Sequence, residues 1–216
     1  MTETDDDTRG YLITFEGSEG SGKSTQIGRI ADRFTDAGYD VIVTREPGGT
    51  ALGEEIRHIL KHADNGAGMF PEAELLLFAA SRAQLVREVI EPGIKAGKIV
   101  LCDRFMDSTT VYQGLGRKMQ SGPVHVINTF AVGDINPDVT VVIDIPAEVG
   151  FERIQNRVTD LHDRMEEENI EFYRNVREGY LMLAKALPER FIVVNGMEEI
   201  SAVEESIWKL LRKRVI

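Results

Sequence analysis

Five short apolar runs divide the chain, and stretches with helical periodicity separate them. Each run is continuous in apolar residues rather than alternating, as is typical of a strand buried on both faces of a sheet. Strands that alternate with helices are joined in parallel by right-handed crossovers. The sequence therefore predicts an α/β sandwich of three layers, with a five-stranded parallel sheet flanked by helices. The predicted strands are Tyr11–Phe15, Val41–Thr44, Ile99–Cys102, Val139–Ile143 and Phe191–Val194.

The stretches between these runs follow the i, i+3, i+4, i+7 pattern of amphipathic helices. Helices are predicted after residue 25, from near Pro71 to Ile90, over Phe172–Leu187 and over Ile200–Arg212. Ligands of parallel sheets bind beyond the carboxyl ends of the strands. The segments expected around one crevice are therefore 16–25, 45–50, 103–116 and the region after 145.

The length of 216 residues suits one domain. We expect it to span residues 11–216, behind a disordered acidic tail at 1–10. A net charge of −11 argues against a broad nucleic-acid surface. No apolar run is long enough to cross a bilayer, and the first residues lack the pattern of a signal peptide. The sequence thus predicts a cytoplasmic protein with neither nucleic acid nor membrane as a partner.

The loop after the first run has the frame Gly17-x-x-x-x-Gly22-Lys23-Ser24, which is the Walker A pattern. A strand precedes it and an amphipathic helix follows, as that pattern requires. Lys23 would reach the β- and γ-phosphates of ATP, and the Ser24 hydroxyl would bind Mg²⁺. The alternative is a glycine-rich turn that only joins a strand to a helix. The residues expected to hold ATP are Gly17, Ser18, Glu19, Gly20, Ser21, Gly22, Lys23, Ser24 and Thr25.

The third run ends in Asp103-Arg104-Phe105, and this ending narrows the class of nucleotide-binding protein. A GTPase would carry a base-reading Asn-Lys-x-Asp, and no such tetrapeptide occurs in the sequence. An arginine beside the aspartate indicates a second anion held close to the metal. A phosphorylated acceptor supplies such an anion, so the ending favours a nucleoside monophosphate kinase.

Further segments combine with the loop in an order and spacing that resemble the thymidylate kinase family. They are TREPGGT (44–50), FAASRAQ (78–84), DRFMDSTTVYQG (103–114), PDVTVVIDIPAEVGFERI (137–154) and DRMEEE (163–168). The resemblance runs from about residue 11 to the C-terminus. It implies a P-loop NTPase fold, transfer of the ATP γ-phosphate to dTMP to give dTDP and ADP for dTTP biosynthesis, and a homodimer.

The resemblance also implies a base pocket. Phe78 would stack on the thymine ring, and Arg82, one helical turn further on, would donate to thymine O4. Thr109 and Gln113 are candidates for the base edge at N3, and Tyr112 would exclude a 2′-hydroxyl. Other readings stay open, because Phe78 also fits an apolar stripe, Arg82 a solvated helix face and Tyr112 a cap on the core.

The same resemblance assigns the phosphate end of the acceptor. Arg45 and Arg104 would hold the 5′-phosphate of dTMP, since guanidinium forks match phosphate oxygens. Asp103 would interact with Mg²⁺ through water in this family's arrangement. Glu19, an anion within a phosphate-binding loop, would face the acceptor sugar, accept from its 3′-hydroxyl and pair with an acceptor-site arginine.

The loop itself holds no arginine for the charge that spreads over the γ-phosphoryl group. Arg153, Arg157 and Arg164 lie in a segment at about 153–170, which we expect to close as a lid. Arg153 and Arg157 are four residues apart and would share one helical face, which is also what an ordinary solvated helix would show. The residues expected to take part in catalysis are Lys23, Asp103, Arg104, Arg153, Arg157 and Arg164.

Two other functions compete with dTMP phosphorylation. One is a kinase for a different nucleoside monophosphate or for a deoxynucleoside. The other is a non-catalytic switch that only senses ATP, against which the acceptor residues at 78–82 and 103–113 argue. Release of ADP with a panel of monophosphates separates the three.

Overall fold

The computed structural model describes residues 9–62, 68–117, 119–156 and 168–215. Its centre is a parallel sheet with the strand order β2-β3-β1-β4-β5. Ile13 on the central strand is paired with Leu101 on one side and Val139 on the other. The predicted parallel sheet is therefore confirmed. Its strands are β1 (Tyr11–Glu16), β2 (Val41–Arg45), β3 (Ile99–Asp103), β4 (Val139–Asp144) and β5 (Phe191–Asn195).

Each strand ends one residue later than the apolar runs predict, and the added residue is always polar. The added residues are Glu16, Arg45, Asp103, Asp144 and Asn195. Their backbones still pair in the ladder, as Arg45 does with Asp103 and Asp144 with Asn195. The apolar pattern misses them because their side chains are polar, and they stand at the carboxyl ends of the strands, where ligands of parallel sheets bind.

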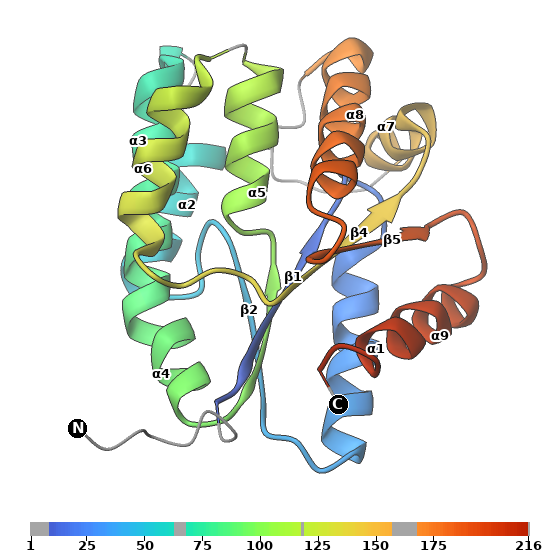
Figure 1. Ribbon diagram of the computed structural model, residues 1–216. Helices are drawn as coiled ribbons and strands as arrows, with labels where there is room; N and C mark the ends of the chain where they lie inside the picture. The colour runs from blue at the N-terminus through green and yellow to red at the C-terminus, as the bar shows by residue number, and fades with distance from the viewer. Residues whose placement is uncertain (1–8, 63–67, 118, 157–167, 216) are drawn as a thin grey trace.

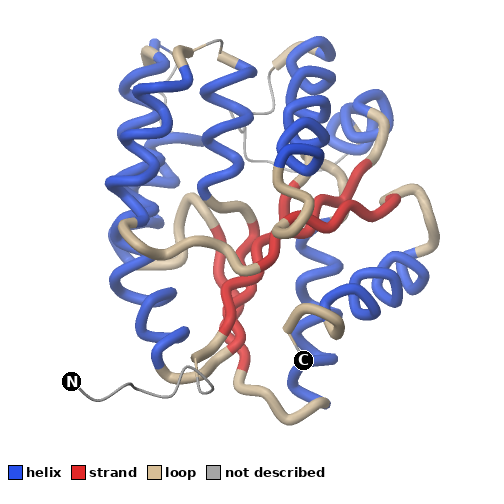
Figure 2. The backbone as a smooth tube through the Cα atoms, in the orientation of Figure 1, coloured by secondary structure: helices blue, strands red, loops and turns tan. Residues whose placement is uncertain are grey.

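Helices lie on both sides of the sheet (Figures 1 and 2). On one side α1 and α9 pack over Ile13, Leu101 and Val141 in the larger core. On the other, α3, η3 and α4 cover Leu12 and Val100, and α8 packs with η4 over β4 and β5. The helices include α1 (Lys23–Asp36), α3 (Pro71–Leu85), η3 (Val86–Ile90), α4 (Glu91–Lys95), α7 (Ala147–Gln155), α8 (Ile170–Ala186) and α9 (Ile200–Leu211).

Three further helical segments were not predicted from the sequence. They are α2 (Ala51–Lys61), the continuous pair α5 (Met106–Thr109) and η4 (Thr110–Gly116), and α6 (Ser121–Val132). A start signal for α2 is present, because the Thr50 side chain accepts from the backbone N–H of Gly53 at 2.9 Å. In η4 the hydrogen bonds follow the wider π pattern, so a 3.6-residue period does not describe it.

The beginning of the described chain is attached to the domain. Arg9 pairs with Asp138 at 2.8 Å, and the backbone N–H of Gly10 donates to Ile94 at 2.8 Å. The predicted tail therefore includes two residues with firm contacts, while residues 1–8 lie outside the described part. Among the described helices, none has the length and apolar character that a bilayer crossing demands.

Candidate active site

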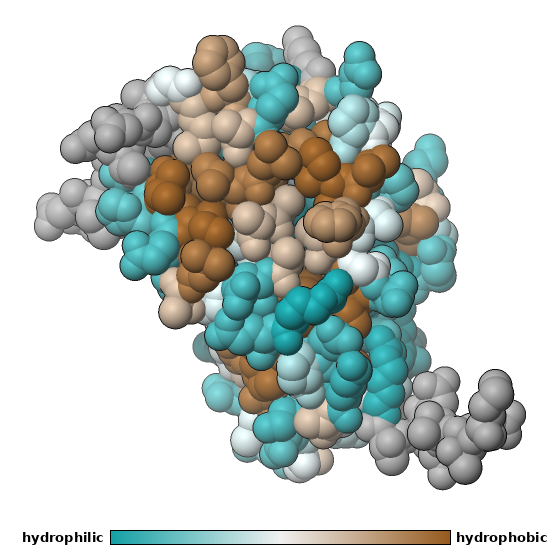
Figure 3. Space-filling model, turned by 90° about the vertical axis from the view of Figure 1, so that its left-hand side faces the viewer, coloured by the Kyte–Doolittle hydropathy of each residue, from teal (hydrophilic) through white to brown (hydrophobic). Residues whose placement is uncertain are grey.

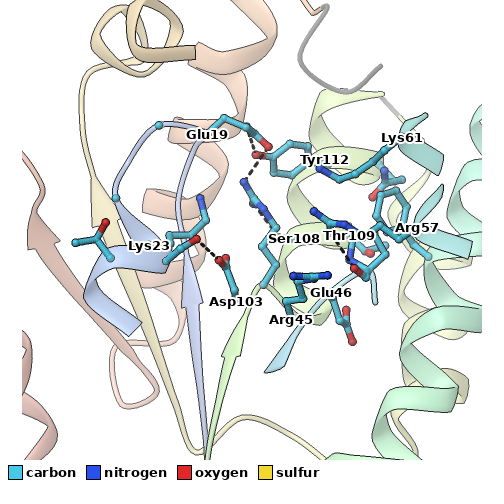
Figure 4. A pocket seen from close by; sticks show the side chains of 18 of the residues that line it. Glu19, Lys23, Arg45, Glu46, Arg57, Lys61, Asp103, Ser108, Thr109 and Tyr112 are labelled. Carbon is cyan, nitrogen blue, oxygen red and sulfur yellow. Dashed lines mark hydrogen bonds and ion pairs between the residues drawn. The ribbon is translucent and has the colours of Figure 1, made fainter. Parts of the chain in front are cut away.

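The predicted crevice exists as one cavity of about 430 Å³ at the carboxyl ends of β1, β2 and β3 (Figure 4). This volume lies within the range of small-molecule sites. The phosphate loop forms one end, and residues after β3 together with α2 and α3 form the other. The lining side chains from the predicted set are Glu19, Lys23, Ser24, Thr25, Arg45, Phe78, Asp103, Arg104, Thr109, Tyr112, Gln113 and Arg153.

The phosphate loop packs tightly between β4 and α7. Gly17 has φ +134° and Gly20 has φ +73°, conformations that favour glycine. A Cβ on Gly17 would lie 2.6 Å from the Ile143 carbonyl oxygen, and one on Gly20 would lie 2.8 Å from that of Gly150. Gly17, which belongs to the Walker A frame, and Gly20, which stands at one of its variable positions, are therefore both needed for the loop to reach its place. Gly17, Ser18 and Ser21 shape the loop without lining the cavity.

Lys23 begins α1 and folds back over the loop. Its ammonium donates to the carbonyl oxygens of Gly17 at 3.1 Å and Ser18 at 2.9 Å, and to the Ser21 hydroxyl at 3.4 Å. Burial and the positive charge of Arg104 lower the pKa of Lys23 to about 8. The ammonium is thus a buried cation held by neutral oxygens, which a phosphate can replace as better partners.

Ser24 and Asp103 form a pair of oxygen ligands beside Lys23. The Ser24 hydroxyl donates to Asp103 Oδ2 at 2.7 Å. Hydroxyl and carboxylate oxygens suit Mg²⁺, which is commonly held by one or two protein oxygens, waters and substrate phosphates. Among the described residues there is no cluster of three or more acidic, histidine or cysteine ligands. The donor set therefore fits a magnesium ion brought in with a nucleotide rather than a dedicated protein cage.

Glu19 turns away from the phosphate loop toward the acceptor end. Its carboxylate accepts from Arg104 at 2.8 Å and from the Tyr112 hydroxyl at 2.7 Å (Figure 4). Burial opposes ionisation, but the charges of Arg104 and Lys23 outweigh it and lower the pKa of Glu19. This carboxylate is therefore paired with Arg104 and bonded to Tyr112, and its contact with the acceptor sugar stays a prediction.

Arg104 is held in an unusual backbone conformation by a residue that sequence reasoning missed. Its φ is +69°, which is uncommon outside glycine. The fully buried Glu16 accepts from the next backbone N–H, of Phe105, at 2.8 Å, and from the hydroxyls of Ser108 and Tyr180, each at 2.7 Å. Burial raises the pKa of Glu16. The signal for it was a glutamate closing a buried strand directly before the phosphate loop.

The far wall of the cavity carries Phe78, Thr109 and Gln113. Gln113 donates through its amide nitrogen to the buried Glu74 at 2.8 Å. Phe78 also packs against the core beside Tyr112, as its place in an apolar stripe indicates, and its stacking on a base stays a prediction. Tyr112 is 5% exposed and edges onto Phe172, so it too belongs both to the cavity and to the core.

Arg82 lies behind this wall rather than in it. Its side chain is 1% exposed, which excludes the solvated helix face considered from the sequence. It donates to Glu46 at 2.8 Å, to Asn128 at 2.6 Å and to Thr109 at 3.0 Å. Thr109 therefore stands between Arg82 and the cavity, and a direct bond from Arg82 to a base stays a prediction.

Arg45 and α2 supply a basic side of the cavity. Arg45 is paired with both oxygens of Glu54, at 3.0 and 2.9 Å, and is half exposed. Arg57 and Lys61 also line the cavity, and Arg57 donates to the Pro47 carbonyl at 2.9 Å. Their spacing of four residues places both on one face of α2. Sequence reasoning missed them because it did not predict this helix.

Of the three arginines expected in the lid, Arg153 lies within the described residues. It belongs to α7, lines the cavity and donates to the Gly20 carbonyl at 2.9 Å. It thus contacts the phosphate loop itself. Arg157, Arg164 and most of the predicted lid lie outside the described residues. At the far side of that gap, Glu168 pairs with Arg117.

Fold and cavity together define a P-loop kinase with room for a second ligand beside the phosphate loop. The family model for thymidylate kinase matches residues 15–207. A thymidylate kinase of Geobacter sulfurreducens is 48% identical over 210 residues, with 95% of this chain and 98% of that protein covered. One of Pelobacter propionicus is 50% identical over 202 residues, 92% of each chain. The chain belongs to the thymidylate kinase family.

A solved structure agrees with this assignment. The crystal structure of thymidylate kinase from Ehrlichia chaffeensis has a TM-score of 0.76 and 34% sequence identity to this chain. It covers 94% of this chain and 99% of its own. The family transfers a phosphoryl group from ATP to dTMP.

Proposed function

We propose that this protein phosphorylates dTMP with ATP at the cavity between the phosphate loop and the wall of α3 and η4. One observation carries the proposal. A single cavity joins Lys23 and Ser24, which suit a nucleotide polyphosphate, to Phe78 and Gln113, which suit a flat base with polar edges. A switch that senses only ATP has no use for the second half of this cavity.

The donor half would work by charge. The backbone N–H groups of the loop and Lys23 bind the β- and γ-phosphates of ATP, and Lys23 exchanges its loop carbonyls for phosphate oxygens. Ser24 and Asp103 would hold Mg²⁺, which supplies further neutralisation of phosphate charge when bound. Arg153 reaches the loop from α7, and Arg157 and Arg164 stay candidates for the same charge.

The acceptor half would position dTMP for in-line transfer. Arg104 and Arg45 bind the 5′-phosphate, and Glu19 accepts from the 3′-hydroxyl while it holds Arg104. An oxygen of that phosphate forms a bond to the γ-phosphorus of ATP as the bond to the β-bridging oxygen breaks, giving dTDP and ADP. Phe78 stacks on thymine, Thr109 and Gln113 contact its edge, and Tyr112 closes the space of a 2′-hydroxyl.

Release of ADP tests the proposal. We expect the wild type to release ADP in the presence of dTMP and much less ADP with dCMP or purine monophosphates. The Lys23→Ala variant should show no release of ADP that depends on an acceptor. Release with another monophosphate in preference to dTMP would move the protein to a different kinase specificity. Release without dependence on any acceptor would favour the ATP-sensing switch.

We further propose that the chain forms a homodimer through α3 and α6. These two helices pack side by side and expose large apolar side chains, with Leu76 56%, Val126 65% and Phe130 87% exposed. Figure 3 looks onto this side of the molecule and shows apolar side chains gathered on it. Contiguous apolar surface of this kind marks interfaces.

The mass in solution tests the dimer. Phe130→Glu should halve the mass seen in sedimentation or light scattering. Met182→Glu changes a side chain that is 62% exposed on α8, away from this surface, and should leave the mass unchanged. A wild-type monomer would refute the dimer without affecting the kinase assignment.

A further inference from the structure

The base wall has a fixed pattern of donors and acceptors, and buried residues behind it set that pattern. Gln113 lines the cavity from η4, while Glu74 lies in the first turn of α3 and is 1% exposed. The two are joined by a bond from Gln113 Nε2 to Glu74 Oε1 at 2.8 Å. Within the described residues, this is the one side-chain hydrogen bond that Gln113 makes.

The carboxylate decides which way the amide of Gln113 faces. An ionised carboxylate accepts hydrogen bonds and donates none, so the NH₂ end of the amide must face Glu74. Arg117 places a positive charge 3.4 Å from each oxygen of Glu74. The carbonyl end of Gln113 is then directed to the cavity, where it can only accept. A glutamine without such a partner could turn over and present a donor instead.

Thr109, one helical turn before Gln113, presents a hydrogen-bond donor to the cavity instead of an acceptor, and a buried partner again sets this direction. Its oxygen accepts from Arg82 at 3.0 Å, and an arginine cannot accept in return. No acceptor for the Thr109 hydroxyl proton is found in the part of the chain described. The hydroxyl therefore offers a donor to the cavity, beside the acceptor that Gln113 offers.

The donor of Thr109 and the acceptor of Gln113 together match the hydrogen-bonding edge of thymine and uracil. Thymine and uracil present an acceptor at O4 and a donor at N3–H on neighbouring positions. Cytosine presents the reverse, a donor amine at C4 and a bare N3. A base that reverses both would leave two buried polar contacts unsatisfied, which is how large discrimination arises.

We propose that Glu74 is a specificity-determining residue of this site, although it does not touch the substrate. By fixing the amide of Gln113 it makes the pocket select a base with a proton on N3. This rests on the proposed dTMP kinase function. Glu74 acts through Gln113 and is therefore a positioning residue.

The test compares Glu74→Gln with Glu168→Gln. Both variants remove one carboxylate that contacts Arg117, but only Glu74 holds Gln113. We expect Glu74→Gln to lower the ratio of kcat/KM for dTMP to that for dCMP about tenfold or more. Glu168→Gln should keep this ratio within about twofold of the wild type. The ratio of kcat/KM for dTMP to that for dUMP should not change in either variant, since thymine and uracil present the same O4 and N3–H groups.

The uracil comparison separates a positioning role from general damage. A pocket that is merely loosened would lose its selectivity against dUMP and dCMP alike. A double-mutant cycle adds a second check. Gln113→Leu should lower the dTMP to dCMP ratio by itself, and Glu74→Gln on top of it should change the ratio no further. Should Glu74→Gln fail to fold, Glu74→Asp withdraws the oxygens from Gln113 while keeping the charge, and should lower the ratio too.

The outcomes distinguish the two hypotheses. A wild type that discriminates against dCMP, together with an unchanged ratio in Glu74→Gln or Glu74→Asp, would overturn the role of Glu74 alone. A wild type that does not phosphorylate dTMP would overturn the proposed function itself. Additive effects in the cycle would also reject the route through Gln113.

Discussion

The two ends of the cavity are built by different means. At the phosphate loop, the geometry comes from backbone: glycines with positive φ, a tight fit against β4 and α7, and one lysine bonded to loop carbonyls. At the acceptor wall, it comes from buried side chains that hold one another. Three such pairs are Glu19 with Arg104, Glu46 with Arg82, and Glu74 with Gln113.

The difference follows from what each end must recognise. A polyphosphate needs N–H groups and a cation, and it can replace the carbonyls that Lys23 uses in their absence. A base and a sugar need donors and acceptors in fixed directions, and only satisfied networks keep polar side chains so directed inside a protein. Buried ion pairs add little net stability, so their value at the acceptor wall lies in orientation.

The largest expected effect is a loss of turnover when Lys23, at the ATP-binding end of the cavity, is replaced. Lys23→Ala should lower kcat by about 10⁴-fold or more, which is about 5.4 kcal/mol of transition-state stabilisation. Because Lys23 bonds to its own loop and not to the acceptor networks, dTMP binding should stay within about threefold of the wild type. Steady-state kinetics and calorimetric titration with dTMP measure the two. Lys209→Ala, on the exposed face of α9, is the control and should change neither.

A parallel loss of dTMP binding in Lys23→Ala would show that the two ends are not independent. Near-normal turnover would reject the phosphate-loop assignment altogether.

The arginines near the loop come next. Single changes of Arg153, Arg157 and Arg164 to alanine should include at least one with kcat lowered by about 10³-fold at saturating ATP and dTMP, by analogy with arginine fingers. Arg153 is the candidate with a contact, since it donates to the Gly20 carbonyl. Arg174→Ala, which removes an exposed arginine of α8, serves as the control. If kcat of all three variants stays within about tenfold of the wild type, these arginines do not supply the positive charge that is missing from the phosphate loop.

The sequence predicted the donor end more completely than the acceptor end. Backbone sites leave a local signature, so the spacing from Gly17 to Ser24 was enough to locate the loop, its strand and its helix. Networks join residues far apart in the chain, as Glu16 joins Phe105 and Tyr180, and no local pattern reports them. Side-chain direction was also hidden, since the family resemblance named Arg82 for the base but could not show Thr109 in front of it.

The cost of the acceptor networks should appear as a pH dependence of stability. Burial raises the pKa of Glu46 to about 7, although Arg82 opposes the shift, and its Oε1 is buried without a hydrogen-bond partner in the described structure. Between pH 4.5 and 7 the folded state keeps a proton that the unfolded state has lost. The free energy of unfolding should therefore fall as pH rises through this window, by about 3 kcal/mol for this group.

Urea unfolding of the wild type and Glu46→Gln at pH 5 and pH 7.5 measures this contribution. Glutamine cannot titrate, so the free energy of unfolding of the variant should increase relative to that of the wild type as pH rises. Equal pH dependence in both proteins would mean that Arg82 keeps Glu46 ionised throughout, and that this network is less costly than its burial indicates.

The smallest expected effect concerns the sugar. The Tyr112 ring makes an edge contact with Phe172, and the guanidinium carbon of Arg104 lies 5.0 Å from the ring centre. The Tyr112 hydroxyl donates to Glu19 at 2.7 Å. Tyr112→Ala opens the space in which a 2′-hydroxyl would lie, so the preference for dTMP over UMP should fall about tenfold, or about 1.4 kcal/mol. Tyr112→Phe keeps the ring and loses only the bond to Glu19, so it should retain that preference. The ratio of kcat/KM for the two substrates is the measurement. A ratio unchanged in Tyr112→Ala removes the ring from sugar selection, whereas an equal fall in both variants would assign the selection to the Glu19 contact instead of to the ring.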